Sequence, residues 1–417
     1  MSTINPSWII WSVAAVATAG VILRPWRVPE YAWALGGALL LTLLGLISPR
    51  AALDAVAKGG DVYLFLIGMM VLAELARQEG LFDWLARYAV RHAKGSGQRL
   101  FDLVFGVGTL VTVFLSNDAT AVVLTPAVYA ACKAAKAEPL PYLFICAFIA
   151  NAASFVLPIS NPANLVVFGS HMPPLLDWLR QFSLPSLAAI GLTYLALRLT
   201  QGRQLRRPLA LDIEITPLPT GARLCAWGIT ATAAVLLTAS ALDVALGLPT
   251  FCAGLATAVL VHLSQRRSPW PVARQVSWGV LPLVAGLFVL VEAVAATGVI
   301  ERLAQALAAL AQASPTQASW AAGITVAIAS NLMNNLPSGL IAGSIGQLVH
   351  VPGQTTAALL IGVDLGPNLS ITGSLATLLW LVAIRREGEQ VSAWRFLRLG
   401  VVVMPPALLG ALLLLQV

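Results

Sequence analysis

The sequence predicts an all-α polytopic membrane protein made of two inverted repeats, and three observations support this. First, 58% of the 417 residues are hydrophobic and only 10% are charged, with a mean hydropathy of +0.83. Second, several segments run at least 16 residues without a charge, which is enough to cross a bilayer core of about 30 Å as a helix. Third, a shift of 218 residues places Gly68 on Gly286, Glu74 on Glu292 and Gly80 on Gly298 without a gap. Such internal repeats are typical of secondary transporters.

The first repeat, residues 1–200, divides into seven segments. The expected order is spans 7–23, 31–48 and 62–77, an amphipathic segment 79–94, a hairpin 99–131, a broken helix 141–170 and a span 184–200. The amphipathic segment carries apolar residues on one face and charges on the other, as interfacial helices do. The polar triplet at 116–118 interrupts two apolar arms, which indicates a re-entrant hairpin, and two prolines at 158 and 162 break the following helix.

The second repeat, residues 222–417, follows the same order. We expect spans 222–241, 249–264 and 277–297, an amphipathic segment 299–313, a hairpin 318–349, a broken helix 356–384 and a span 394–415. The connector 201–221 contains three arginines and three prolines and is the expected cytoplasmic boundary between the repeats. About ten transmembrane helices, two re-entrant helical hairpins and two broken helices result, although hydropathy alone also allows twelve spans.

The basic residues predict the orientation. Five crossings in each repeat invert the second repeat relative to the first. With both termini outside, every one of the 25 Lys and Arg residues except Arg50, Lys58, Arg180 and Arg302 lies on the cytoplasmic side. The net charge of +7 is spread singly and in pairs between apolar spans, so we expect contact with membrane lipids and none with nucleic acid. The first span has no basic residue before it and is expected to be a retained span with its start outside.

The four interruptions are expected to form one polar site near the middle of the membrane, because non-helical backbone at that depth must be buried in protein or line a wet cavity. The candidate substrate-binding residues are Ser116, Asn117, Thr120, Ser160, Asn161, Asn331, Asn334, Asn335, Asn368, Thr372, Gly373 and Ser374. The alternative is that these residues only cap half-helices. Asn161 followed by proline, for example, has the pattern of an N-cap.

Asp118 and Asp364 are the two carboxylates expected at the centre of the membrane, where a charge costs about 2.5–3.5 kcal/mol. Asp118 precedes the second arm of its hairpin, where a helix N-terminus favours the anion. Asp364 ends a half-helix, so we expect it to be the more easily protonated group and assign proton coupling to the pair. A capping role is the alternative for Asp118. For Glu74 and Glu292, near the ends of their spans, we favour a structural or gating role.

Enzyme chemistry is not expected. The motifs HExxH, GxSxG, GxGxxG and GxxxxGK(S/T) are missing, and the four cysteines are far apart without CxxC spacing. We therefore predict neither a catalytic residue, nor a cofactor, nor a metal site.

Four runs of residues resemble the arsenite efflux permeases of the ArsB type, which belong to the ion-transporter superfamily that includes the dicarboxylate/sodium symporters. They are LSNDATAVVLTP at 115–126, SNLMNNLP at 330–337, GVDLGPN at 362–368 and GSLATLLW at 373–380, and the similarity extends over essentially the whole chain. The resemblance implies export of arsenite and antimonite across the bacterial cytoplasmic (inner) membrane, driven by the proton gradient or membrane potential. It also implies, in some members, an arsenical-stimulated ATPase subunit on the cytoplasmic side.

The residue chemistry agrees with a substrate that is mostly an uncharged trihydroxy acid near neutral pH. Amides and hydroxyls supply both donors and acceptors for such a molecule. Two central acids would repel a dianion, which counts against a dicarboxylate transporter. The same acids would also suit a sodium/proton antiporter, whereas a passive channel would need no protonatable group.

Overall fold

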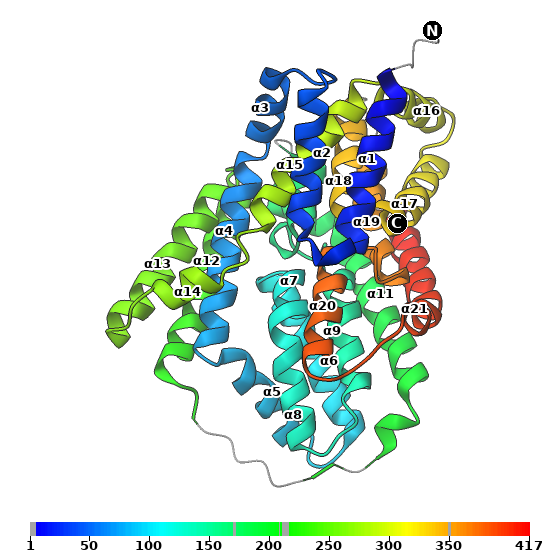
Figure 1. Ribbon diagram of the computed structural model, residues 1–417. Helices are drawn as coiled ribbons and strands as arrows, with labels where there is room; N and C mark the ends of the chain where they lie inside the picture. Colours follow the sequence, from blue (N-terminus) through cyan, green and yellow to red (C-terminus); the bar gives the residue numbers. More distant parts are fainter. Residues whose placement is uncertain (1–5, 170–171, 208, 211–216, 349–351) are drawn as a thin grey trace.

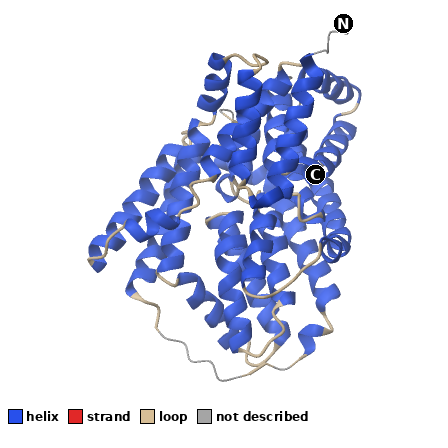
Figure 2. Ribbon diagram, in the orientation of Figure 1, coloured by secondary structure: helices blue, strands red, loops and turns tan. Residues whose placement is uncertain are grey.

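The computed structural model describes residues 6–169, 172–207, 209–210, 217–348 and 352–417, and every regular element within these ranges is helical (Figure 2). The first repeat contains α1 (Pro6–Leu23), η1 (Pro25–Arg27), α2 (Glu30–Leu43), α3 (Pro49–Lys58), α4 (Gly60–Gln78), α5 (Leu81–His92), α6 (Gly97–Phe114), α7 (Asn117–Ala119), η2 (Thr120–Leu124), α8 (Thr125–Ala134), α9 (Leu140–Ala152), η3 (Pro158–Ser160), α10 (Pro162–Phe168) and α11 (Leu175–Gln201). The predicted all-α class is confirmed.

The second repeat follows a short helix η4 (Gln204–Arg206). It contains α12 (Thr220–Ala241), α13 (Gly247–Gln265), α14 (Trp270–Gln275), α15 (Val280–Ala295), α16 (Val299–Ala313), α17 (Pro315–Met333), α18 (Asn335–Leu348), α19 (Gly353–Leu365), η5 (Gly366–Leu369), α20 (Leu375–Arg386) and α21 (Ala393–Leu414). The short helices α3 and α14 were not predicted, because each is too short and too polar to be recognised as a span.

Packing between helices follows the symmetry of two repeats (Figure 1). Helix α4 packs on α13 as α15 packs on α2, and α6 packs on α9 as α17 packs on α19. Helix α10 lies against α18, while its counterpart α20 lies against η2 and α8. The two counterparts α11 and α21 pack on each other. Each repeat therefore completes its packing with elements of the other.

The amphipathic segments are separate helices that turn away from the preceding spans. Helix α16 is bent by 74° from α15. Both turns are made by a glycine in the left-handed region, Gly80 (φ 77°) before α5 and Gly298 (φ 78°) before α16. A side chain is strained in that conformation, which explains glycine at both repeat-related positions.

Length and apolar composition identify five single helices that can cross a membrane among the described residues: α6, α11, α12, α13 and α21. The bent pairs α3–α4 and α15–α16 also qualify when each is taken as one span, and α1, α2 and α9 are shorter apolar helices. Helix α6 is the first arm of a hairpin: it ends at Phe114, and after Ser116 the chain continues into α7 and η2, which pack against α6. The protein is thus a multi-pass membrane protein whose hairpins and broken helices lie within the bundle.

Glycines allow two pairs of spans, α4 with α13 and α2 with α15, to pack with their backbones close together. A Cβ on Gly68 of α4 would lie 2.4 Å from the carbonyl oxygen of Thr250 on α13. At the repeat-related contact, a Cβ on Gly286 of α15 would lie 2.7 Å from the backbone of Ala34 on α2. A backbone atom cannot rotate away as a side chain does, so the helices must separate if either glycine gains a side chain.

We expect Gly68→Ala and Gly286→Ala each to destabilise the protein by about 1–3 kcal/mol, the usual cost of overpacking. The matched control is Gly36→Ala, because a Cβ at that helical position meets nothing within 4 Å. All three changes gain the same helix propensity. The thermal unfolding midpoint in one detergent is the measurement, and a Gly68→Ala midpoint at or above that of Gly36→Ala would contradict the packing argument.

Candidate transport site

A small cavity lies where both hairpin tips and both helix breaks meet. Its volume of ≈ 20 Å³ holds about one water molecule. The first residues of four helices line it: Asn117 of α7, Pro162 of α10, Asn335 of α18 and Leu375 of α20. Four helix N-termini thus end on one point, and their dipoles favour negative charge there.

Polar side chains at the breaks cap these helices. Ser116 Oγ accepts from Ala119 N at 3.2 Å, Asn161 Oδ1 accepts from Ala163 N at 3.0 Å, and Ser374 Oγ accepts from Thr377 N at 3.0 Å. Asn334, at a φ of 77°, turns the second hairpin, and its Oδ1 accepts from Leu336 N at 3.4 Å. Helix capping therefore accounts for part of the polarity at the breaks.

Asp118 is the carboxylate that lines the cavity, together with the amides of Asn117, Asn161 and Asn335. Within the described part of the chain, no hydrogen bond or ion pair reaches the carboxylate of Asp118, which is partly exposed. Asn335 Oδ1 is buried without a partner. The cavity therefore presents one carboxylate and one amide oxygen that are free to accept hydrogen bonds.

Asp364 does not line the cavity and is buried, with only 1% of its surface exposed. Its Oδ1 accepts from Asn161 Nδ2 at 2.8 Å, while its Oδ2 has no partner. Since Asn161 also lines the cavity, its amide connects Asp364 to the cavity. The contact joins the two repeats, because Asn161 belongs to the first broken helix and Asp364 to the second.

The other predicted site residues do not line this cavity in this conformation; they brace the breaks. Asn331 Nδ2 donates to the carbonyls of Ala327 and Gly366 at 2.8 and 2.9 Å, and its Oδ1 accepts from Ser370 Oγ at 2.7 Å. The remaining contacts are Asn334 Nδ2 to Thr372 O (3.3 Å), Thr372 Oγ1 to Asn331 O (3.0 Å), Asn368 Nδ2 to Phe148 O (3.0 Å), Ser160 Oγ to Val113 O (3.0 Å), and the Thr120–Thr112 hydroxyl pair (2.8 Å). Gly373 allows close approach, since a Cβ there would lie 2.5 Å from Pro367 Cα.

Two buried asparagines were missed by the sequence analysis. Asn151 Nδ2 donates to Asn368 Oδ1 at 3.0 Å and to Thr377 Oγ1 at 3.3 Å. Asn164 Nδ2 donates to three carbonyls of the first break, those of Ser154, Leu157 and Pro158. A shift of 213 residues, which aligns the caps of α10 and α20, places Asn151 on Asp364. Allowing that five-residue gap in the repeat would have identified Asn151.

A larger cavity of ≈ 590 Å³ lies one helical turn from the small cavity, along α4, α10, α15 and α18, each of which contributes residues to both cavities. Its lining includes one residue from each of these helices that lies about one turn from a residue lining the small cavity: Val62 of α4, Leu165 of α10, Phe288 of α15 and Leu340 of α18. We call it the outer vestibule, because the orientation predicted from the basic residues would place its charged residues outside. They are Lys58, Asp61, Asp243 and Glu292.

On the opposite side, α20 packs along η2 and α8, and contacts at their far ends hold them together. Lys133 on α8 pairs with Glu389 at 3.5 Å, and Tyr129 Oη donates to Glu387 O at 2.8 Å. The small cavity is therefore separated from the outer vestibule by one turn of apolar side chains, and from the opposite end of the molecule by the packed length of α8 and α20.

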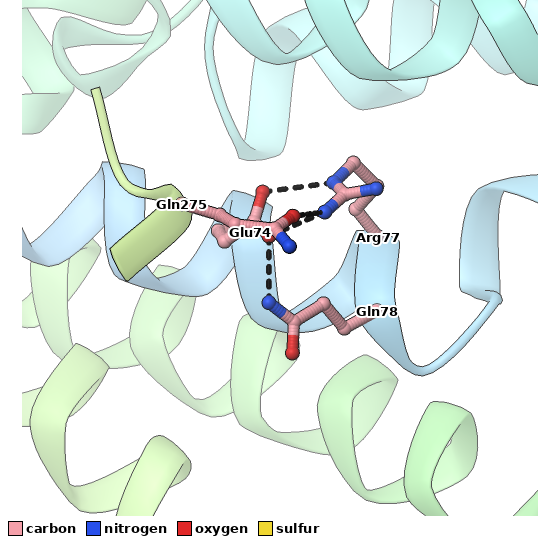
Figure 3. A network of polar contacts seen from close by, with 4 residues as sticks. All are labelled: Glu74, Arg77, Gln78 and Gln275. Atoms are coloured by element: carbon pink, nitrogen blue, oxygen red, sulfur yellow. Dashed lines mark hydrogen bonds and ion pairs between the residues drawn. The ribbon is translucent and has the colours of Figure 1, made fainter. Parts of the chain in front are cut away.

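The two repeat-related glutamates have different surroundings. Glu74 is buried near the C-terminal end of α4, where it accepts from Arg77 Nε at 2.8 Å and from Gln78 Nε2 at 2.7 Å (Figure 3). Arg77 also donates to Gln275 of α14. Glu292 instead lies on the outer vestibule and pairs with Lys58 at 2.8 Å. Neither glutamate lines the small cavity.

We expect Asn161→Ala to cost about 2–4 kcal/mol in the free energy of unfolding, because it removes a helix cap and also leaves the buried Asp364 without its donor. The control Ser374→Ala removes the repeat-related cap without removing a donor to a carboxylate and should cost about 1 kcal/mol. Thermal or denaturant unfolding distinguishes them, and equal losses would mean that the Asn161–Asp364 bond contributes nothing.

The outer vestibule predicts one-sided labelling. In a chain whose native cysteines are replaced, Ser344→Cys in the vestibule should react with a membrane-impermeant thiol reagent added to intact cells. The control Ser268→Cys, in the exposed turn between α13 and α14, should react only in everted vesicles. The reverse pattern would overturn the orientation.

Comparison with known proteins places the chain among transporters. Residues 8–366 match the profile of the citrate transporter family. An arsenical pump membrane protein of Yersinia enterocolitica is 27% identical over 364 residues, and one of Escherichia coli strain K12 is 27% identical over 361 residues; each match covers 82% of both chains. An uncharacterised transporter of Mycobacterium tuberculosis is 27% identical over 417 residues, 94% of both chains.

A solved structure shares the fold. The YdaH transporter of Alcanivorax borkumensis, whose crystal structure is described as having an unusual topology, superposes with a TM-score of 0.56 at 17% identity, over 98% of this chain and 97% of that chain. The resemblance drawn from the sequence motifs is confirmed by these relatives, and the protein is a transporter, not an enzyme. The chain belongs to the citrate transporter family of membrane transporters and is related to the arsenical pump membrane proteins.

Proposed function

We propose that this protein exports arsenite, and antimonite with it, from the bacterial cytoplasm in exchange for protons. The observation that carries the proposal is the small cavity, where three amides and one carboxylate meet at four helix N-termini. The names of two relatives supply the substrate class. The proposed location is the bacterial cytoplasmic membrane, with both termini outside and residues 201–221 as a cytoplasmic connector between repeats 1–200 and 222–417.

The groups on the cavity suit a small uncharged trihydroxy acid. Asp118 and Asn335 Oδ1 accept hydrogen bonds from hydroxyl groups, and the amide NH₂ groups of Asn117 and Asn161 donate to the oxygen atoms. Among the residues that the structure describes, no Lys or Arg lines the cavity. A volume of ≈ 20 Å³ fits one water and not arsenite, so this conformation has a closed site that must widen to bind substrate.

In the proposed cycle, α8 and α20 first move away from the helices they pack against, which opens the cavity to the cytoplasm. Arsenite enters by this path and leaves through the outer vestibule. A proton entering from outside is taken up by Asp118 and exchanged with Asp364. Asn161 donates a hydrogen bond to Oδ1 of Asp364. Moving one proton inward for each neutral arsenite expelled supplies about 2.3 kcal/mol per 100 mV of membrane potential. An arsenical-stimulated ATPase subunit stays a prediction of the resemblance.

A dicarboxylate or citrate transporter is the second candidate, favoured by the family profile and by the four helix N-termini, which stabilise anions. Asp118 on the cavity and the missing basic lining count against it, because a dianion would meet a negative charge without a counter-charge. A sodium/proton antiporter would use the same two carboxylates.

Arsenite uptake into everted vesicles tests the proposal. The native protein should accumulate arsenite against its gradient, and an uncoupler should abolish the accumulation. Asp364→Asn should remove the uphill component while leaving exchange of labelled for unlabelled arsenite measurable. The matched control is Asp102→Asn, since Asp102 is an exposed acid that accepts from Tyr194 Oη at 2.8 Å and does not line the cavity.

Each competing function gives a different result in that assay. Uphill export by Asp364→Asn would show that the proton role is wrong. Uptake insensitive to an uncoupler would identify a passive channel, and proton flux that depends on sodium and not on arsenite would identify an antiporter. Uptake of labelled citrate without any uptake of arsenite would establish the second candidate.

A further inference from the structure

A second polar pocket lies apart from the transport site, between α9, the end of α11 and the start of α21. Its volume is ≈ 530 Å³. The described residues that line it are Phe144, Thr200, Gln201, Ser392, Trp394, Arg395, Arg398, Leu399 and Val402. None of these is acidic. The proposed transport function makes no use of this pocket.

The two arginines have no counter-charge. Within the described ranges, neither Arg395 nor Arg398 forms an ion pair with a carboxylate, and both are exposed. Each guanidinium instead lies over an aromatic ring: Arg395 Cζ is 5.7 Å from the ring centre of Phe144, and Arg398 Cζ is 5.0 Å from that of Trp394. Such cation–π contacts orient the guanidinium groups without cancelling their charge.

The repeat provides an internal comparison. The shift of 218 residues places Arg395 on Asp177 and Arg398 on Arg180, at the start of α11. Asp177 and Arg180 pair with each other at 3.3 Å. The start of α11 therefore carries an ion pair without net charge, so the fold does not require two positive charges at this position. The two unpaired arginines are specific to the start of α21, which the distribution of basic residues predicts to be cytoplasmic.

The lining of the pocket changes from charged to apolar along α21, as expected for a lipid site. Trp394 is 59% exposed, and tryptophan is enriched where the hydrocarbon core meets the headgroups. One and two turns further into α21, Leu399 and the half-exposed Val402 continue the same wall as apolar surface. A ligand with an anionic head and an apolar tail matches this sequence of charge, hydroxyl and hydrocarbon.

We propose that this pocket binds an anionic phospholipid of the cytoplasmic leaflet. Its phosphate lies against the guanidinium groups of Arg395 and Arg398, whose planar donors suit phosphate oxygens, and an acyl chain follows Leu399 and Val402. Basic pockets on the cytoplasmic side of helical membrane proteins recognise lipid headgroups in this way.

Native mass spectrometry of the full chain tests the proposal, with phosphatidylglycerol and phosphatidylcholine as probes. The native protein should retain phosphatidylglycerol in preference. R395Q/R398Q should bind it roughly thirtyfold more weakly, because each basic residue near an anionic lipid contributes about fivefold in affinity. The matched control R385Q/R386Q removes two exposed arginines at the end of α20, outside the pocket, and should bind like the native protein.

Equal weakening in both double variants would overturn the site, since it would indicate diffuse attraction to the surface. Equal retention of the two lipids by the native protein would also overturn it. Inorganic phosphate and the water-soluble headgroup glycerophosphoglycerol form a further arm: displacement of the lipid by either at equal concentration would assign the pocket to a soluble anion. Equal unfolding temperatures of all variants in phosphatidylcholine establish that each one is folded.

Discussion

The structure depends on one constraint, which is that backbone N–H and C=O groups released within the membrane must be satisfied by protein. In the described part of the chain, two hairpin tips and two helix breaks interrupt the helices around the cavity, and a side chain within a few residues caps the helix that follows each of them. Ser116, Asn161, Asn334 and Ser374 each accept from the start of the following helix. Asn164 donates to three carbonyls of the first break, and Asn331 donates to the carbonyl of Gly366 at the second. The helix N-termini can meet at a cavity because their breaks are secured in this way.

The two repeats share a plan and differ in the chemistry at matching positions. The broken helix of the second repeat carries Asp364 where the first carries Asn151, and each contacts the opposite repeat. The hairpin tip of the first repeat carries Asp118, whereas the second tip is amide throughout. Asymmetry of charge on a symmetric frame is what we use to assign coupling to the acids. The same contrast separates the paired Asp177 and Arg180 from the unpaired arginines of the lipid pocket.

Access to the cavity is uneven across the membrane. One turn of apolar side chains divides it from a charged vestibule, whereas α8 and α20 remain packed to the ends that lie away from the cavity. The conformation is therefore closed around the site, with its thinner barrier toward the outer vestibule. The two repeat-related glutamates differ in the same way. Glu74 is enclosed in a hydrogen-bond network near the C-terminal end of α4, whereas Glu292 lines the vestibule.

The sequence by itself determined the all-helical membrane class, the repeat, the positions of both hairpins and both broken helices, and the relation to arsenical pumps. These features are local or periodic: a hydrophobic run, a break within it, or a motif can be recognised along the chain. Helices α3 and α14 were missed since short polar helices lack such a signal. Only the tertiary structure decided which polar residues line the cavity. Asn117, Asn161 and Asn335 line it, whereas Asn331 and Asn368 brace the backbone, although all are asparagines at predicted breaks. The distinction depends on helix rotation and on contacts between residues far apart in the chain, such as Asn161 and Asp364 at a separation of 203 residues, which no local pattern encodes.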